Sequence, residues 1–248
     1  MPEGPSLVIA KELMLPFKGK KILAVEGNSK IGIERLVNKK LIDILTWGKH
    51  LIFRFDKFSV RVHFLMFGTY YINSRKDAVP RLSMKFSKGE INLYTCAVKM
   101  IEEPLDEIYD WSADVLSDEW NEKAARKKLK ARPDVLVADA LLDQTIFSGV
   151  GNIIKNEVLY RIKVHPTNTI SVLPPAKLTQ LIKEARNYSF DFLEWKKEFT
   201  LKKHWLVHTK KTCQRDGDKI HKEYIGITNR RTFFCNTCQK LYRVRKSA

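Results

Sequence analysis

Short apolar runs separated by polar turn residues dominate roughly the first hundred positions of the chain. Residues 6–15 differ, because good helix formers with helical spacing follow Pro5 and end before Pro16. The β-rich runs that follow comprise residues 21–25, 41–45, 50–55, 59–64, 70–72, 82–86 and 91–94. This pattern is typical of an antiparallel β-sandwich or barrel, here with one flanking helix at the start of the chain.

Helical spacing replaces these short runs in the second half of the chain. Residues 102–118 are rich in Asp and Glu and are predicted to form a linker. The helices predicted after the linker are residues 119–131, 135–142, 151–162 and 175–196. Residues 143–152 join two of them in a run that is too long for one tight turn and contains Gly149 and Gly151. From about residue 207 the chain is basic, short-stranded and carries cysteines.

The charge balance narrows the classes of function. Lys and Arg total 45 against 28 Asp and Glu, which gives a net charge of +17 over 248 residues and a pI near 9.7. This excess predicts a polyanionic partner, which could be DNA, RNA or an anionic membrane. The first residues lack the pattern of a secretory signal, and no apolar run approaches the ~20 residues that span a bilayer. Nucleic acid in the cytoplasm, at the nucleoid if the source is bacterial, is therefore favoured over a membrane.

Three of the four cysteines lie close together near the end of the chain: Cys213, Cys235 and Cys238. Such crowding without a secretory signal favours a metal site over a disulfide framework. The spacing Cys235-x2-Cys238 is that of half a zinc site.

The first residues, Met1-Pro2-Glu3, could supply a nucleophile. Removal of Met1, which is usual before a proline, leaves Pro2 with a secondary amine. An α-amino group has a pKa of roughly 8, so a useful fraction is neutral and nucleophilic near neutral pH. Glu3 beside it could move protons. The alternative is that these residues only cap a helix.

Four segments, in order along nearly the whole chain, resemble the formamidopyrimidine-DNA glycosylase and endonuclease VIII family. They are residues 1–5 (MPEGP), residues 47–53 (WGKHLIF), residues 141–153 (LLDQTIFSGVGNI) with 156–159 (NEVL) and 165–166 (HP), and residues 230–239 (RRTFFCNTCQ). The third segment is similar to the family's helix–two-turn–helix element and the fourth to the second half of its zinc hairpin.

The resemblance implies a catalytic role for three residues. Pro2 is the expected Schiff-base nucleophile, and Glu3 is the expected proton donor and acceptor. Lys49, on a Gly-Lys turn, is expected to bind a phosphate and to assist protonation. An ordinary exposed lysine at the start of a strand is the alternative interpretation of Lys49.

The resemblance also implies contacts to DNA. Asn152, at the start of a helix after a glycine turn, is expected to hold the phosphate beside the lesion. Arg230 is expected to clamp the same backbone, with Arg231 as the rival for that role. Met66 matches the wedge that fills the gap left by a flipped base, a task that Leu65 and Phe67 could share. The alternative places these three side chains in the core of the sandwich.

The chain departs from the family in one loop. The branch that removes oxidised purines carries an Asp-x-Arg-Arg-Phe-Gly loop after its middle strands, whereas this chain has residues 93–102, LYTCAVKMIE, in that place. This segment is more similar to the endonuclease VIII branch, which favours oxidised pyrimidines as substrates.

The metal site is a second departure. The family's hairpin uses two Cys-x2-Cys pairs, but here the partner of Cys213 in that register is Asp216. We expect one structural Zn²⁺ on Cys213, Cys235, Cys238 and Asp216. His221 is the alternative fourth ligand, His208 is a more remote one, and a hairpin that keeps its shape without metal also remains open.

The prediction is an α+β, multidomain protein: an N-terminal antiparallel β-sandwich with a flanking helix (1–110), a helix–two-turn–helix domain (111–205) and a zinc hairpin (206–248). The expected function is a monomeric DNA glycosylase and abasic-site (AP) lyase that acts on damaged duplex DNA without a nucleotide cofactor. A catalytically silent protein that binds damaged DNA is the main alternative, and a basic zinc-bearing RNA- or ribosome-associated protein is a more distant one.

Overall fold

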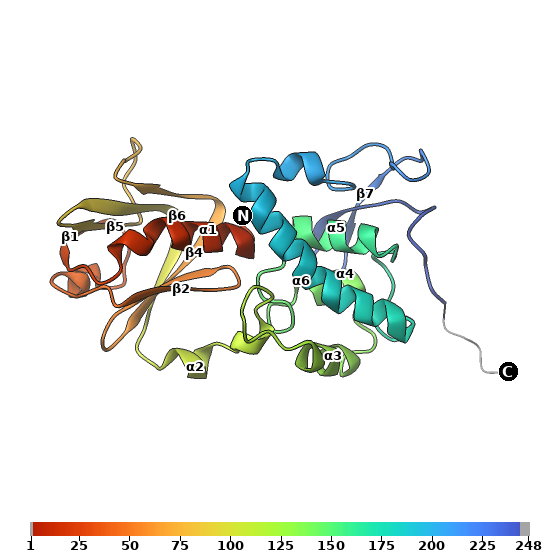
Figure 1. The fold of residues 1–248 in the computed structure, drawn as a ribbon, viewed down its shortest axis with the longest axis horizontal. Helices are drawn as coiled ribbons and strands as arrows, with labels where there is room; N and C mark the ends of the chain where they lie inside the picture. The colour runs from red at the N-terminus through yellow and green to blue at the C-terminus, as the bar shows by residue number, and fades with distance from the viewer. Residues whose placement is uncertain (1, 244–248) are drawn as a thin grey trace. The chain divides into compact units, whose positions relative to one another are not determined.

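The chain divides into two compact units, residues 1–110 and residues 111–248, and each is described by itself. The structure, a computed structural model, describes residues 2–243 (Figure 1). The predicted α+β class is confirmed, with an N-terminal antiparallel sheet, a helical part and a C-terminal hairpin. No helix within residues 2–243 is both long and apolar enough to cross a membrane.

The first unit consists of a six-stranded antiparallel sheet and a helix, α1 (Gly4–Met14). The strands lie in the order β1-β5-β6-β4-β3-β2. Their bounds are β1 (Ile22–Glu26), β2 (Asp43–Trp47), β3 (His50–Arg54), β4 (Ser59–Ile72), β5 (Leu82–Phe86) and β6 (Gly89–Ile101). Short helical segments are η1 (Leu15–Phe17), η2 (Ile33–Leu36) and α2 (Leu105–Ile108).

Two long strands, β4 and β6, connect the two halves of this sheet (Figure 1). β3 pairs with residues 59–62 of β4, whereas β5 pairs with residues 89–93 of β6. The sequence therefore predicted two strands, 59–64 and 70–72, where the structure has one strand interrupted by an excursion between Phe64 and Thr69. Predicted strand 91–94 is likewise only part of β6.

The core of the first unit explains the position of α1. Leu7, Ala10 and Met14 recur at helical spacing and are all at most 1% exposed. They place α1 against β2 and β3. The start of the chain is therefore held at one end of a helix that packs on the sheet.

The second unit is built from helices and one hairpin. Its helices are η3 (Trp111–Ala113), α3 (Glu122–Lys130), α4 (Val137–Leu142), α5 (Asn152–Arg161), α6 (Pro175–Lys197) and η4 (Leu201–His204), and its strands are β7 (His221–Ile225) and β8 (Arg230–Phe234). The predicted linker, 102–118, is not irregular throughout, since it contains α2 and η3.

The hairpin packs on the helices. Ile225 and Phe234 belong to the same buried apolar cluster as α4, α5 and α6. A smaller cluster joins Tyr160 of α5 to Cys213, Phe233 and Cys235. The helical part and the hairpin thus share apolar contacts, and the boundary at residue 205 stays a prediction.

Candidate functional site

Pro2 and Glu3 directly precede the first turn of α1 in the first unit. Glu3 occupies the N-cap position in an extended conformation (φ −100°, ψ 166°), but its side chain makes no capping hydrogen bond. Only 5% of Glu3 is exposed, which is unusual for a carboxylate. Helix capping therefore does not account for Glu3. Met1 lies outside the described residues.

Lys49 is the second residue of a two-residue turn between β2 and β3, where Trp47 pairs with His50. Gly48 takes the first position with φ +52°, a conformation that favours glycine in such hairpin turns. Because α1 packs against β2 and β3, the same helix that begins after Glu3 contacts the strands that carry Lys49.

Two histidines lie close to Lys49. The rings of His50 and His63 are 5.3 Å apart, and His50 also contacts Tyr109. Burial, together with the charges of Arg61, His63 and Lys49, lowers the pKa of His50 to about 3. Burial and Lys49 also lower the pKa of His63. Both rings are therefore neutral at neutral pH, so the positive charge here is that of Lys49 and Arg61.

The excursion in β4 carries Met66 to the surface. Phe64 pairs with Cys96 and Thr69 with Tyr94, so residues 65–68 face only Thr95 on β6. Leu65, Met66 and Phe67 are 45%, 59% and 83% exposed. The interpretation that they belong to the core is therefore wrong.

Asn152 is the first residue of α5 in the second unit, directly after the N-cap Gly151. Gln144 shapes the preceding turn by accepting a hydrogen bond from the Gly149 N–H (3.1 Å) and donating one to the Val150 carbonyl (3.1 Å). The Asn152 amide donates to the Arg231 carbonyl at 2.8 Å. Its oxygen, Oδ1, is buried and has no hydrogen-bond partner among residues 2–243.

Two further side chains hold the hairpin beside Asn152. Asp139 of α4 accepts hydrogen bonds from the Ile227 N–H (3.0 Å), the Thr228 N–H (3.3 Å) and the Thr228 hydroxyl (3.0 Å). Lys155, which is fully buried, donates to the Thr232 hydroxyl at 2.7 Å. Arg230 and Arg231 lie between these anchors and are both exposed. The structure thus brings Asn152 and the start of β8 together.

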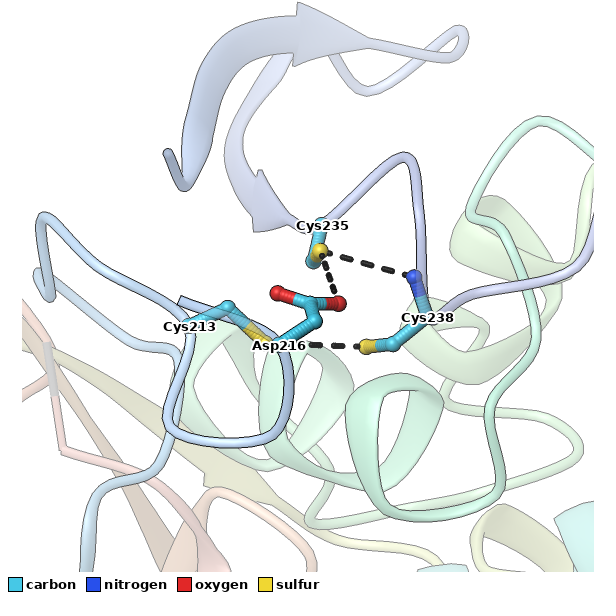
Figure 2. A group of neighbouring side chains, drawn as sticks. All are labelled: Cys213, Asp216, Cys235 and Cys238. Carbon is cyan, nitrogen blue, oxygen red and sulfur yellow. Dashed lines mark hydrogen bonds between the residues drawn. The ribbon is translucent and has the colours of Figure 1, made fainter. Parts of the chain in front are cut away.

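A four-residue cluster lies where two loops of the hairpin region meet: Cys213, Asp216, Cys235 and Cys238 (Figure 2). Their ligand atoms all lie within 4.8 Å of one another. Cys213 Sγ and Cys238 Sγ are 3.8 Å apart, and Cys235 Sγ is 3.2 Å from Asp216 Oδ2. Metal–sulfur bonds of ~2.3 Å in a tetrahedron put two sulfurs about 3.8 Å apart. These residues could therefore hold a metal ion.

Two side chains support the cluster from outside. The Tyr160 hydroxyl lies 3.0 Å from Cys213 Sγ. Arg215 lies 3.4 Å from Cys238 Sγ, donates to the Tyr160 carbonyl and stacks on the Tyr160 ring. Its charge opposes the negative charge that thiolates would bring to the site. Burial raises the pKa of Cys235 to about 12, so a bound cation would have to displace the thiol proton.

The two alternative histidine ligands lie outside this cluster. His221 Nε2 is 3.2 Å from Asn236 Nδ2, and the ring stacks on Phe234. His208 Nδ1 is 3.0 Å from Asn156 Nδ2. Among residues 2–243, Asp216 is therefore the fourth residue that the structure gathers with the three cysteines.

The site contains three residues that the sequence did not single out: Asp139, Lys155 and Arg215. Asp139 binds backbone 88 and 89 residues further along the chain, and no local pattern indicates such a partner. Lys155 had one sequence indication, since a lysine among the buried apolar residues of α5 must find a polar partner.

Comparison with known proteins identifies the family of the chain. Residues 112–197 match the model of the formamidopyrimidine-DNA glycosylase H2TH domain. Endonuclease 8-like 3 of Xenopus laevis is 31% identical over 232 residues, covering 88% of this chain and 38% of its own. Formamidopyrimidine-DNA glycosylase of Lactobacillus johnsonii is 26% identical over 279 residues, covering 98% of this chain and all of its own. The chain belongs to the formamidopyrimidine-DNA glycosylase/endonuclease VIII family.

The fold agrees with a solved member of the family. Lactococcus lactis formamidopyrimidine-DNA glycosylase, crystallised with DNA containing an AP site, superimposes with a TM-score of 0.85. The match covers 96% of this chain and 100% of the other at 24% identity, so it establishes the fold. The chain spans only 38% of the length of the Xenopus relative.

Proposed function

We propose that the chain is a bifunctional DNA glycosylase and AP lyase that removes oxidised bases, with oxidised pyrimidines favoured, from duplex DNA. The observation that carries the proposal is Glu3: a carboxylate only 5% exposed, next to Pro2, whose side chain makes no capping hydrogen bond to the helix. Membership of a family whose relatives are named glycosylases and endonucleases supports it.

The proposed reaction begins at the Pro2 nitrogen once Met1 has been removed. The neutral amine attacks the sugar C1′ and the C1′–base bond breaks, so that the base leaves with the bonding electrons and takes up a proton. Glu3 takes the N–H proton from the attached Pro2 nitrogen and delivers it to the ring oxygen as the sugar opens, which leaves an iminium ion between Pro2 and C1′. Loss of a C2′ proton to a base then expels the 3′ phosphate, and a second elimination expels the 5′ phosphate. Water finally releases Pro2 by hydrolysing the iminium.

The remaining site residues are proposed to position DNA. Lys49 carries a charge that its neutral neighbours His50 and His63 do not share, which suits a phosphate beside the opening sugar. The Asn152 amide nitrogen, which has a second N–H besides the one given to the Arg231 carbonyl, and the exposed Arg230 lie beside the glycine turn and the start of α5. Met66, with Leu65 and Phe67, offers an exposed apolar wedge for the space that a flipped base vacates.

Zinc is the proposed metal. Three cysteine sulfurs and one carboxylate in tetrahedral reach match its ligand preferences, with no place left for a reacting water. The role of the cluster is therefore structural: Cys213 and Asp216 hold one loop against the turn that carries Cys235 and Cys238. This arrangement would fix β8 and, with it, Arg230.

Borohydride trapping on duplex DNA with an abasic site tests the proposed chemistry. A sample shown by mass spectrometry to begin at Pro2 should form a covalent adduct and nick the strand. A matched sample with two extra residues retained before Pro2 has an amide in place of the amine and should form none. A sample with the same extension at its C-terminus is the control and should react normally.

The Glu3→Gln variant separates the two steps. It should slow excision of thymine glycol far more than cleavage at a preformed abasic site, because the second substrate needs no base removal. Equal excision by the variant and the parent would refute the role of Glu3. A protein that starts at Pro2 and shifts damaged DNA on a gel, but never becomes trapped, would instead be the catalytically silent binder.

A further inference from the structure

A cationic groove of about 480 Å³ lies beside the C-terminal hairpin, and none of the four candidate metal ligands lines it. Lysines from three segments and an arginine line it: Lys210, Lys211, Lys219, Lys222 and Arg231. The buried ring of Phe233 forms part of its apolar lining. Asn152 and Arg230 do not line the groove, whereas Arg231, the rival of Arg230, does.

The backbone brings these cations together. The Ile220 N–H donates to the Lys211 carbonyl at 2.9 Å, and Thr212 bridges to Lys219, so the segments before and after the Cys213 loop run side by side. On the hairpin, Lys222 pairs with Phe233. Side chains alternate along a strand, so Lys222, Phe233 and Arg231 share one face. Five positive charges therefore border one groove.

The part of the groove lining that the structure describes carries no negative charge. No acidic residue lines it, and none of its five cations forms an ion pair within residues 2–243. Glu223 lies between Lys222 and Tyr224 on β7, so it belongs to the opposite face, where its charge acts on His165. Like charges gathered in this way attract an anion.

The electrostatics of a neighbouring ring agree with this excess. The His208 ring contacts the Phe233 ring at 5.2 Å, which places it next to the groove lining. Burial, followed by the charges of Lys155 and Arg231, lowers the pKa of His208 to about 4. The surroundings of the groove thus disfavour a further positive charge.

We infer that this groove is a second phosphate-binding track, which holds DNA backbone beyond the lesion-flanking phosphates assigned to Asn152 and Arg230. The inference rests on the proposed function for the identity of the polyanion. Cations spread along an open groove suit successive phosphates of one strand, whereas a single small anion would engage only some of them.

The test is the salt dependence of binding to undamaged duplex DNA, measured by fluorescence anisotropy. The triple variant Lys211→Gln, Lys219→Gln, Lys222→Gln removes three groove charges. Each lost phosphate contact should lower the slope of log affinity against log salt by about 0.9. We expect the slope to fall by about 2 to 3 and the affinity at 0.15 M salt to fall at least about tenfold.

Two matched variants make the result specific. Lys123→Gln, Lys127→Gln, Lys130→Gln on α3 changes the net charge equally and should leave the slope unchanged. Lys211→Arg, Lys219→Arg, Lys222→Arg keeps the charge and should keep the slope. An equal decrease of the salt slope in the groove and α3 variants, or no decrease in either variant, would overturn the inference.

The outcomes also separate this inference from the proposed function. If the parent protein becomes trapped on abasic DNA while its groove variant keeps the full salt slope, the phosphate-binding track is refuted and the proposed enzymatic function stands. If the parent binds DNA through the groove but is never trapped, the proposed enzymatic function is refuted and the phosphate-binding track stands.

Discussion

Asp139 shows how one side chain can set the position of a distant functional residue. It is 9% exposed, and its carboxylate accepts three hydrogen bonds from the turn between β7 and β8. Gly226 begins this turn at φ +79°, and a Cβ there would lie 2.3 Å from the Asp139 carboxylate. The turn therefore fits against Asp139 only with glycine at this position, and Arg230 follows directly after it.

Replacing Asp139 should lower both the stability of the second unit and the affinity for DNA. Asp139→Ala leaves three donors without their acceptor, which should lower the free energy of unfolding of the second unit by about 1–3 kcal/mol. Urea denaturation measures this loss, and anisotropy at fixed salt should show weaker binding of abasic duplex DNA. Asp139→Asn keeps one acceptor oxygen and should lose less stability and less DNA affinity than Asp139→Ala.

Asp134→Asn is the matched control. Asp134 is an exposed carboxylate, and this substitution removes the same charge as the change at Asp139. Equal DNA affinity in Asp139→Ala and Asp134→Asn would mean that the turn keeps Arg230 in place without Asp139.

At the scale of elements, the metal cluster decides whether the hairpin region has a fixed shape. The strands β7 and β8 have only five residues each, and an isolated two-stranded hairpin is at best marginally stable. The segment with Cys213 and Asp216 has little secondary structure of its own beyond turns. A metal ion would link this segment to the turn after β8.

We therefore expect one zinc ion per chain by elemental analysis, and loss of zinc with a lower melting temperature in Cys238→Ala. Cys96→Ala is the matched control, since Cys96 is buried in the first unit, far along the chain from the cluster. The Cys96→Ala protein should keep its full zinc content even if the packing of the first unit is less stable. A Cys238→Ala protein that keeps both zinc and hairpin stability would support a hairpin that does not depend on metal.

Elements with a regular pattern could be predicted from the sequence, and those set by distant contacts could not. The helix at residues 175–196 was found nearly to the residue as α6, because its apolar spacing persists over many turns. The continuity of β4 was missed, because the residues between Phe64 and Thr69 leave the ladder. A Cβ on Gly68 would lie 2.7 Å from the Thr95 carbonyl oxygen, a contact invisible in the sequence.

The candidate site divides in the same way. Cys235 and Cys238 follow from their spacing, and Asp216 follows from the register of the family's hairpin; the structure gathers both with Cys213 as expected. His221 was a reasonable alternative by ligand chemistry, but pairing with Phe234 in the hairpin directs it elsewhere. Asp139 and Arg215 act across tertiary contacts, which local patterns do not encode.

At the scale of the whole molecule, partly buried histidines in both units should make stability depend on pH. Burial, together with nearby positive charge, lowers the pKa of His50 in the first unit to about 3 and that of His208 in the second to about 4. Unfolding exposes both rings and restores a pKa near 6.5, so the unfolded chain binds more protons below that pH. The stabilisation is complete above about pH 6.5 and declines as the pH falls towards 4.

Each histidine should contribute up to about 1.4 kcal/mol per pH unit within that window. Urea denaturation between pH 7.5 and 4.5 measures the dependence, and His50→Gln should flatten it for the first unit only. His208→Gln should reduce the pH dependence of the second unit without abolishing it. Protons also compete with the metal for its ligands there, and this variant does not change that competition. His204→Gln is the comparison, since that ring is partly exposed, and it should leave the pH dependence of stability unchanged. If stability were flat down to pH 5 in the parent, the two rings would be able to accept protons in the folded state, and the neutral histidine inferred beside Lys49 and the one inferred beside the groove would both be wrong.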